Sequence, residues 1–203
     1  MIKFREINKE KYTIPDDKSI LGWCDKSLPL TLREHQQEFL KDQSRVVIGH
    51  WGRRTGKSTT CAIQAVYAAA IQGKDVIVVT HNIEAKERFI HDASNLAVRT
   101  NTAYNLVIRS DSLHFHNGSR VIVTSYRGTA NSVCGVTADL VIIDEFHFIK
   151  SDVLDMVIPI IASNGNSRLL MLSTATREPG YSQLIDKNQS SYYRHGAIFE
   201  GVN

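Results

Sequence analysis

Short aliphatic runs alternate with longer segments that carry helix signals along this chain. Residues 76–79 and 140–143 are aliphatic at every position, which is typical of strands buried on both faces of a sheet. Between such runs, Asn82 is a helix-capping residue, and Gly73 ends an alanine-rich segment at the position where helices often stop. The alternation predicts an α/β domain with a mostly parallel central sheet flanked by helices.

The expected elements follow from these runs and their boundary signals. We expect helices over residues 31–41, 59–72, 82–98, 151–162 and 180–188. We expect strands over residues 45–48, 76–79, 104–109, 113–116, 119–124, 140–143, 168–172 and 197–199. Thr31 and Glu34 have the spacing of a capping box, and Asn117-Gly118 predicts a hairpin. Residues 1–30 are predicted to be an irregular lead-in segment before one domain over 31–203.

Composition narrows the classes of protein. The 203 residues favour one domain, and 42% hydrophobic with 22% charged residues is ordinary for a soluble globular chain. A net charge of +3 is too small to indicate a nucleic-acid binder by itself. No apolar run approaches the roughly 20 residues of a membrane span. The three cysteines contain no Cys-x-x-Cys pair, so neither a disulfide framework nor a zinc ribbon is indicated, and a reducing compartment fits.

The sharpest motif is a glycine-rich loop between an expected strand and an expected helix, which is the context of a phosphate-binding P-loop. Its backbone N–H groups are expected to face a β-phosphate, with Lys57 on the β- and γ-phosphates and the Ser58 hydroxyl on Mg²⁺. Trp51 occupies the usual first-glycine position and is expected to pack either on the nucleotide or on a neighbouring helix. The candidate nucleotide-binding residues of the loop are Gly52, Arg53, Arg54, Thr55, Gly56, Lys57, Ser58 and Thr59.

Two acidic residues end the apolar strand at 140–143. In this position Asp144 is expected to hold Mg²⁺, and Glu145 to orient and polarise an attacking water. An adjacent glutamate favours an ATP-hydrolysing P-loop protein of the additional-strand, catalytic-glutamate, RecA-like type over a GTPase or a small-molecule kinase.

Further segments resemble those of nucleic-acid motors in order and spacing. Gln36 lies upstream of the loop, where helicases and phage DNA-packaging motors carry an adenine-binding glutamine, and Gln37 is its expected surface neighbour. The segment from Thr80 to Phe89 follows the second strand, as a DNA-contacting or structural segment does in both families. The third segment resembles the Ser/Thr-Ala-Thr coupling motif of these motors and consists of Ser173, Thr174, Ala175 and Thr176.

From about residue 32 to 186 this set resembles the ATPase domain of the terminase large subunit of tailed bacteriophages. The resemblance implies ATP and Mg²⁺ as cofactors and the translocation of double-stranded DNA into a procapsid. It also implies a homo-oligomeric ring on the portal, a small terminase subunit as partner, location in the host cytoplasm and no membrane association. The nuclease domain of such an enzyme is expected to be absent, so the chain is expected to be part of a larger protein.

The arginines of this family need separate assignment. The first loop arginine, here Arg53, is implicated by the resemblance in stabilising the γ-phosphate. Many terminases carry an Arg-Gly pair about ten residues before the acidic pair, whose arginine acts on a neighbouring subunit's ATP. Here that pair is Cys134-Gly135. Either Arg127, which precedes Gly128, takes the catalytic role in trans, or Arg53 serves alone.

Two other functions are open at the level of sequence. Asp144-Glu145-Phe146-His147 has the Asp-Glu-x-His pattern of superfamily 2 helicases and translocases, and His147 is there a candidate link between nucleotide and DNA. A P-loop fold used as a low-turnover, nucleotide-gated assembly module is the third interpretation. Glu145 argues against it, because a binding switch needs no water-activating carboxylate.

Overall fold

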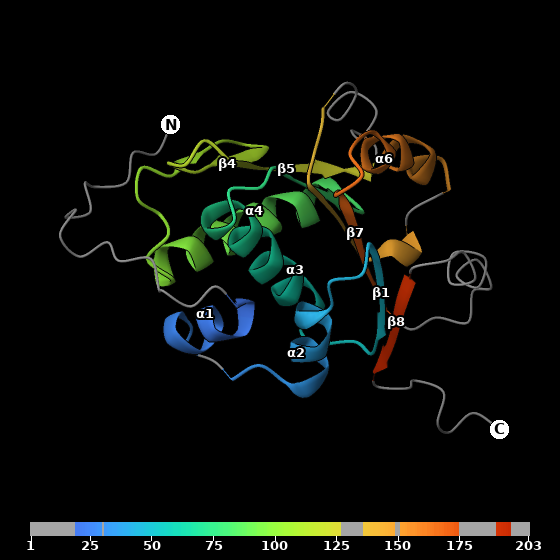
Figure 1. Cartoon of the computed structure of the whole chain (residues 1–203), viewed down its shortest axis with the longest axis horizontal. Coiled ribbons are helices and arrows are strands. Elements are labelled where there is room, and N and C mark those ends of the chain that lie inside the picture. Colours follow the sequence, from blue (N-terminus) through green and yellow to red (C-terminus); the bar gives the residue numbers. More distant parts are fainter. Residues whose placement is uncertain (1–18, 30, 127–135, 149–150, 175–189, 196–203) are drawn as a thin grey trace.

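The computed structural model describes residues 19–29, 31–126, 136–148, 151–174 and 190–195. Within them lies one eight-stranded sheet in the order β3-β4-β5-β2-β6-β7-β1-β8, shown with its helices in Figure 1. The strands are β1 (Val46–Trp51), β2 (Val76–Thr80), β3 (Val107–Ile108), β4 (Ser112–His114), β5 (Arg120–Ser125), β6 (Leu140–Asp144), β7 (Arg168–Thr174) and β8 (Ser190–His195). The helical elements are α1 (Ile20–Ser27), α2 (Glu34–Lys41), α3 (Lys57–Val66), η2 (Tyr67–Ile71), α4 (Ile83–Arg99), η4 (Phe146–Phe148) and α6 (Ser151–Ser163).

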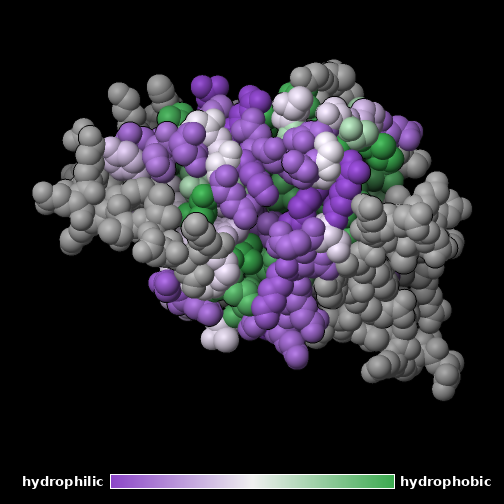
Figure 2. Space-filling model, viewed as in Figure 1, coloured by the Kyte–Doolittle hydropathy of each residue, from purple (hydrophilic) through white to green (hydrophobic). Residues whose placement is uncertain are grey.

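Helices cover both faces of the sheet, as the fully aliphatic strands predict. Alternate residues of β2 point to opposite faces, so Val76 and Val78 pack with the α1–α4 side while Ile77 and Val79 pack with α6. Figure 1 shows α1 to α4 on one side of the sheet and α6 on the other. In Figure 2 hydrophobic groups come to the surface near α6, where Ile158 is exposed. The expected α/β fold is confirmed.

The sheet is parallel from β5 to β8 and antiparallel at its other edge. Strands β2, β6, β7 and β1 pair in parallel with their neighbours, whereas β3-β4 and β4-β5 are antiparallel. The expected hairpin at Asn117-Gly118 is confirmed, and Gly118 has the positive φ of 88° that such a turn requires. The expected strand over 104–109 shortens to β3, because Asn105 has a φ of 51° and leaves the extended region.

Two expectations near the amino terminus are wrong. Part of the lead-in segment is the helix α1, which Ser19 caps by accepting a hydrogen bond from the Gly22 N–H at 3.0 Å. Its Trp23 is fully buried in the main core, so the helix is held by packing that local signals do not reveal. The second helix, α2, is not opened by Thr31. It begins at Glu34, and the Gln36 side chain accepts from the Arg33 N–H at 3.0 Å.

The remaining elements agree in order and differ at their ends. Helix α3 begins at Lys57, two residues before the expected start, and its last turn is the π-helix η2. Strand β8 was not expected, since its sequence lacks an aliphatic run, and it pairs in parallel with β1. The helix expected at 180–188 and the strand expected at 197–199 lie outside the described residues. No helix in the described part of the chain is long and apolar enough to cross a membrane.

Strand order determines where the candidate site forms. β6, β7 and β1 are neighbours and run in parallel, so their carboxyl ends meet at one edge of the sheet. In the register of these strands, Asp144 pairs with Leu172 and Trp51 pairs with Thr174. The glycine-rich loop after β1, the acidic pair after β6 and the polar end of β7 are therefore brought together, at the edge where α/β folds bind ligands.

Candidate nucleotide and metal site

The loop between β1 and α3 has a backbone suited to an anion. Arg54 and Gly56 both have positive φ, 59° and 92°, within a loop that ends at the first turn of α3. Left-handed residues in such a loop turn successive N–H groups toward one point, and the first N–H groups of a helix lack intrahelical partners. A side chain at Gly56 would be strained by the φ of 92° and would also displace the end of the Gln36 side chain, whose Nε2 would lie 2.6 Å from the added Cβ. The loop therefore matches the expected phosphate-binding element.

Lys57 lies over this loop rather than in solvent. Its side chain is only 5% exposed, and Nζ donates to the Gly52 carbonyl at 3.1 Å. The same ammonium lies 3.6 Å from Glu145 Oε1. Because an ammonium has three donors, it can engage a phosphate oxygen in addition to these two groups. Lys57 thus joins the loop to the acidic pair after β6.

Asp144 and Ser58 have the character of a hard-cation site. Asp144 is 6% exposed, and its Oδ1 has no hydrogen-bond partner among the described residues. The Ser58 hydroxyl lies close enough to this carboxyl group to lower its pKa. Burial raises the pKa of Asp144 to about 6, and the charge of Glu145 adds to the increase, while the Ser58 hydroxyl and the charge of Lys57 oppose it. A buried carboxylate with an unused oxygen beside a hydroxyl fits Mg²⁺, which takes a few protein oxygens and completes its shell with phosphates and water.

Glu145 points across the strand ends to β7. Its Oε2 accepts from the Thr174 hydroxyl at 2.7 Å and from the Thr174 N–H at 3.2 Å. Glu145 has a positive φ of 55°, a strained conformation that is found preferentially at functional sites. The side chain is 21% exposed, so it is partly accessible to solvent.

The segment expected to couple hydrolysis to movement contacts Glu145 through Thr174 and His147 through Ser173. The Ser173 hydroxyl and His147 Nδ1 are 3.1 Å apart, and the same nitrogen is 3.4 Å from Glu145 Oε2. His147, Glu145, Ser173 and Thr174 therefore form one polar cluster. Ala175 and Thr176 lie outside the described residues. Sequence spacing indicated the segment but not its direct hydrogen bonds to Glu145.

Helix α2 supports the loop from beneath. Gln36 Nε2 donates to the Thr60 hydroxyl at 3.0 Å and lies 3.5 Å from the Gly56 carbonyl, while its Oε1 accepts from the Arg33 N–H. Both ends of the amide are thus engaged within the protein. Adenine binding by Gln36 stays a prediction, and it requires the amide to exchange one of these partners for the base.

His35 is a residue of the site that sequence reasoning missed. Its Nε2 donates to the Thr55 carbonyl at 3.0 Å, and its ring meets Trp51 edge-on with centroids 4.6 Å apart. Trp51 is fully buried and also packs against Phe39 of α2. Of the two alternatives for Trp51, the neighbouring helix is the one found. The available signal for His35 was its place beside Gln36 on the same helix.

The other expected residues are placed as follows. Arg53 and Arg54 are exposed at the loop, and Thr59 is exposed on the first turn of α3. Thr55 donates through its hydroxyl to the Gly52 carbonyl at 2.8 Å, which tightens the loop. Arg127, the candidate for action in trans, lies outside the described residues, as does the Cys134-Gly135 pair.

Asp144→Asn is expected to stabilise the ligand-free protein at neutral pH. The folded-state pKa of about 6 lies above the ordinary 3.8, so the folded state binds this proton more tightly than the unfolded state does. Ionised Asp144 therefore lowers the free energy of unfolding above about pH 6, and this loss disappears as the pH falls toward 3.8. Denaturant unfolding should show a gain of about 2–3 kcal/mol for the variant at neutral pH and almost none near about pH 4. Exposed Asp92→Asn is the control; an equal gain there would contradict the argument.

The comparisons with known proteins agree with this geometry. The model of a family described as "Terminase large subunit, T4likevirus-type, N-terminal" matches residues 48–191. The structure is similar to the large terminase ATPase domain of Thermus phage P74-26, with a TM-score of 0.71 and 15% identity over 84% of this chain and 83% of that one. A comparison with curated proteins gave no match.

Two further solved structures share the fold, and the helicase is the less similar of the two. The HK97 bacteriophage large terminase has a TM-score of 0.70 at 15% identity, over 87% of this chain and 42% of that one. The UvsW helicase from bacteriophage T4 has a TM-score of 0.59 at 12% identity, over 87% of this chain and 67% of that one. Identities this low show a shared fold, and the family match covers most of the chain. The chain therefore belongs to the family of terminase large subunits of T4-like virus type, as its N-terminal domain.

Proposed function

We propose that this chain is the ATP-hydrolysing motor domain of a viral DNA-packaging terminase. One observation supports the proposal more strongly than the others do. The phosphate-loop residues Lys57 and Ser58, the acidic pair Asp144-Glu145 and the polar end of β7 all meet within hydrogen-bond or ion-pair distance at one sheet edge. This is the set of groups that hydrolysis of a nucleoside triphosphate requires.

Each residue has a separate task in this proposal. The loop N–H groups and Lys57 bind the phosphates, while Ser58 and Asp144 hold Mg²⁺. When bound, the metal neutralises charge on the β- and γ-phosphate oxygens. Glu145 accepts a hydrogen bond from the attacking water and orients it toward the γ-phosphorus. Arg53, exposed at the loop, is proposed to stabilise the charge that develops on the γ-phosphoryl group.

Coupling to movement is proposed to pass through β7. Thr174 donates two hydrogen bonds to Glu145 Oε2, so a change in the position of Glu145 during hydrolysis alters the end of this strand. Ser173 contacts His147 in the same cluster. Ala175 and Thr176 continue the segment in the proposed coupling path.

The biological setting is proposed from the family. Double-stranded DNA is the translocated substrate, and the motor acts as a homo-oligomeric ring on the portal of a procapsid in the host cytoplasm. A small terminase subunit and a nuclease domain of the full-length protein are the further proposed partners. Either Arg127 supplies a positive charge in trans to a neighbouring subunit's ATP, or Arg53 serves alone.

A superfamily 2 helicase or translocase is the second candidate, because His147 both completes an Asp-Glu-x-His sequence and contacts Ser173. The two functions are separated by assays on the full-length protein with Mg²⁺ and ATP. A packaging motor should make duplex DNA resistant to nuclease in the presence of its procapsids, and should displace a triplex-forming strand without separating the duplex. Strand separation without either of these results would overturn the packaging proposal, and Glu145→Gln is the inactive control.

A further inference from the structure

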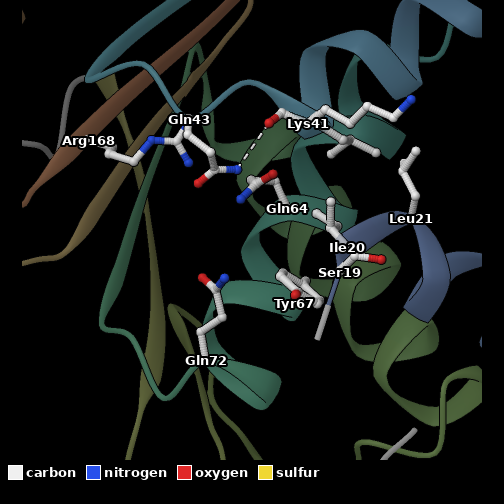
Figure 3. Close-up of a pocket in the computed structure, with 10 residues that line it drawn as sticks. Ser19, Ile20, Leu21, Lys41, Gln43, Gln64, Tyr67, Gln72 and Arg168 are labelled. Carbon is white, nitrogen blue, oxygen red and sulfur yellow. Dashed lines mark hydrogen bonds between the residues drawn. The ribbon is translucent and has the colours of Figure 1, made fainter. Parts of the chain in front are cut away.

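Helix α2 reaches the phosphate loop through its amino-terminal half. His35 contacts the loop, and Gln36 contacts the first turn of α3. Lys41, at the other end of the same helix, lines a separate cavity of about 420 Å³ beside α1 and α3 (Figure 3). None of the described residues that line this cavity belongs to the candidate nucleotide site. The start of α2 is therefore the part of this helix that can act on a bound nucleotide.

His35 holds the peptide group between Thr55 and Gly56 from one side. Its Nε2 lies 3.0 Å from the Thr55 carbonyl oxygen. Because a carbonyl oxygen can only accept, Nε2 carries the hydrogen and donates it. The C=O and N–H of a trans peptide group lie in one plane and point in opposite directions. The Gly56 N–H is therefore directed away from His35, toward the opposite side of the loop.

The backbone alone does not fix this peptide group. Its rotation changes ψ of Thr55 and φ of Gly56. Gly56 has a φ of 92°, and glycine adopts positive and negative φ about equally readily. Glycine therefore permits the rotated arrangement, in which the carbonyl oxygen faces the position of a phosphate and repels it. The hydrogen bond from His35 favours the arrangement that presents the N–H instead.

Aromatic packing holds the imidazole in the place that this hydrogen bond needs. His35 is buried, and its ring meets the Trp51 ring at an interplanar angle of 85° with centroids 4.6 Å apart. Trp51 is also buried and packs edge-on against Phe39, one turn further along α2. Edge-to-face pairs are favourable beyond their buried area. Trp51, at the usual first-glycine position, thus forms one wall of the imidazole site.

The next peptide group is held in the same sense. The Gly56 carbonyl accepts from the Thr60 N–H and from the Thr60 hydroxyl, each at 2.9 Å. The Thr60 hydroxyl in turn accepts from Gln36 Nε2 at 3.0 Å. The Lys57 N–H points away from this carbonyl and belongs to the first residue of α3, where N–H groups lack intrahelical partners. Gly56 and Lys57 thus supply successive N–H groups, the arrangement that binds anions.

We propose that His35 is a positioning residue for nucleotide binding. By holding the Thr55 carbonyl, it keeps the Gly56 N–H directed at the β-phosphate. This inference rests on the nucleotide site of the proposed function. His35 acts through the loop and takes no part in the chemical step, so it stabilises bound substrate and transition state equally. Its loss should therefore raise the Kd and KM for nucleotides and leave kcat unchanged.

Binding of ADP with Mg²⁺ to the 203-residue chain tests the proposal, since ADP carries the β-phosphate and is not consumed. His35→Phe keeps a ring against Trp51 but cannot donate, so it should weaken ADP binding about 3–10-fold, the loss of one hydrogen bond. His35→Gln can bring its amide nitrogen to the position of the imidazole Nε2 and should restore most of the affinity. The shorter His35→Asn should not. His91→Phe on the exposed face of α4 is the matched control and should bind as the wild type does.

Kinetics separate positioning from a purely structural role. Initial rates of ATP hydrolysis by His35→Phe should show KM raised by a similar factor and kcat within about twofold of the wild type. A fall in kcat with KM unchanged would indicate loss of active protein and contradict positioning.

Two further results would overturn the role of His35 and leave the nucleotide site intact. One is wild-type affinity for ADP in His35→Phe, and the other is equal affinity in His35→Gln and His35→Asn. The second comparison decides the matter if His35→Phe does not fold. Failure of the unsubstituted chain to bind ADP would overturn the proposed function itself, and this inference with it.

Discussion

Glu145→Gln is expected to reduce ATP turnover by about 10²–10⁴-fold while leaving ATP binding close to that of the wild type. The amide occupies the same volume and still accepts a hydrogen bond from Thr174, so the cluster at the end of β7 is kept. It cannot take a proton from water at neutral pH, and only the chemical step is removed. Steady-state phosphate release and equilibrium binding of ATP, measured on the same preparation, separate the two effects.

Glu38→Gln is the matched control for this prediction. Glu38 lies on the exposed side of α2, where the loss of one charge should change neither binding nor turnover. If Glu145→Gln hydrolyses ATP at the wild-type rate, Glu145 does not activate water. If it loses ATP binding as well, its role is to hold Lys57, which lies 3.6 Å away, rather than to act in chemistry.

Lys57→Ala is expected to weaken both nucleotide affinity and turnover, with a loss of about 10²–10³-fold in kcat/KM. The ammonium is buried against the loop and is the only lysine side chain placed at the site by the described residues. Its removal takes away the positive charge nearest the phosphates and leaves Glu145 without its cation. Initial rates measured over a range of ATP concentrations give kcat and KM separately.

The control for Lys57 is Lys26→Ala on the exposed face of α1, which should leave kcat/KM unchanged. Thermal unfolding of both variants in the absence of nucleotide shows whether either substitution lowers the stability of the fold. A Lys57→Ala protein that folds and retains wild-type kcat/KM would remove the phosphate-loop assignment. A similar loss of kcat/KM in Lys26→Ala would show that the net charge of the protein, and not the position of Lys57, is responsible.

The candidate nucleotide site could be predicted from sequence because its residues form short, local motifs. Gly56-Lys57-Ser58 and Asp144-Glu145 each follow an apolar strand, and parallel strands present their carboxyl ends at one edge. That argument places the two motifs on the same edge without any knowledge of strand order. The structure adds that β6, β7 and β1 are neighbours in the sheet. The two motifs are therefore close enough to contact each other.

Features that depend on tertiary packing were not accessible in this way. Helix α1 is stabilised by Trp23 within the core, and β8 pairs in parallel with the edge of β1. The two hydrogen bonds from Thr174 to Glu145 depend on the register between β6 and β7. Gln36 was identified by its position, yet its bonds to Thr60 and Arg33 require the α2–α3 contact.

Single-turnover hydrolysis tests the central claim most directly. The chain is mixed in excess over γ-³²P-labelled ATP, so each bound nucleotide is followed through one cycle, with and without Mg²⁺. The structure predicts complete release of labelled phosphate with Mg²⁺, no release after chelation, and retention of intact ATP by Glu145→Gln. Bound ATP that stays intact in the wild type with Mg²⁺, or equal release by Glu145→Gln, would contradict an ATPase site built on Lys57, Asp144 and Glu145.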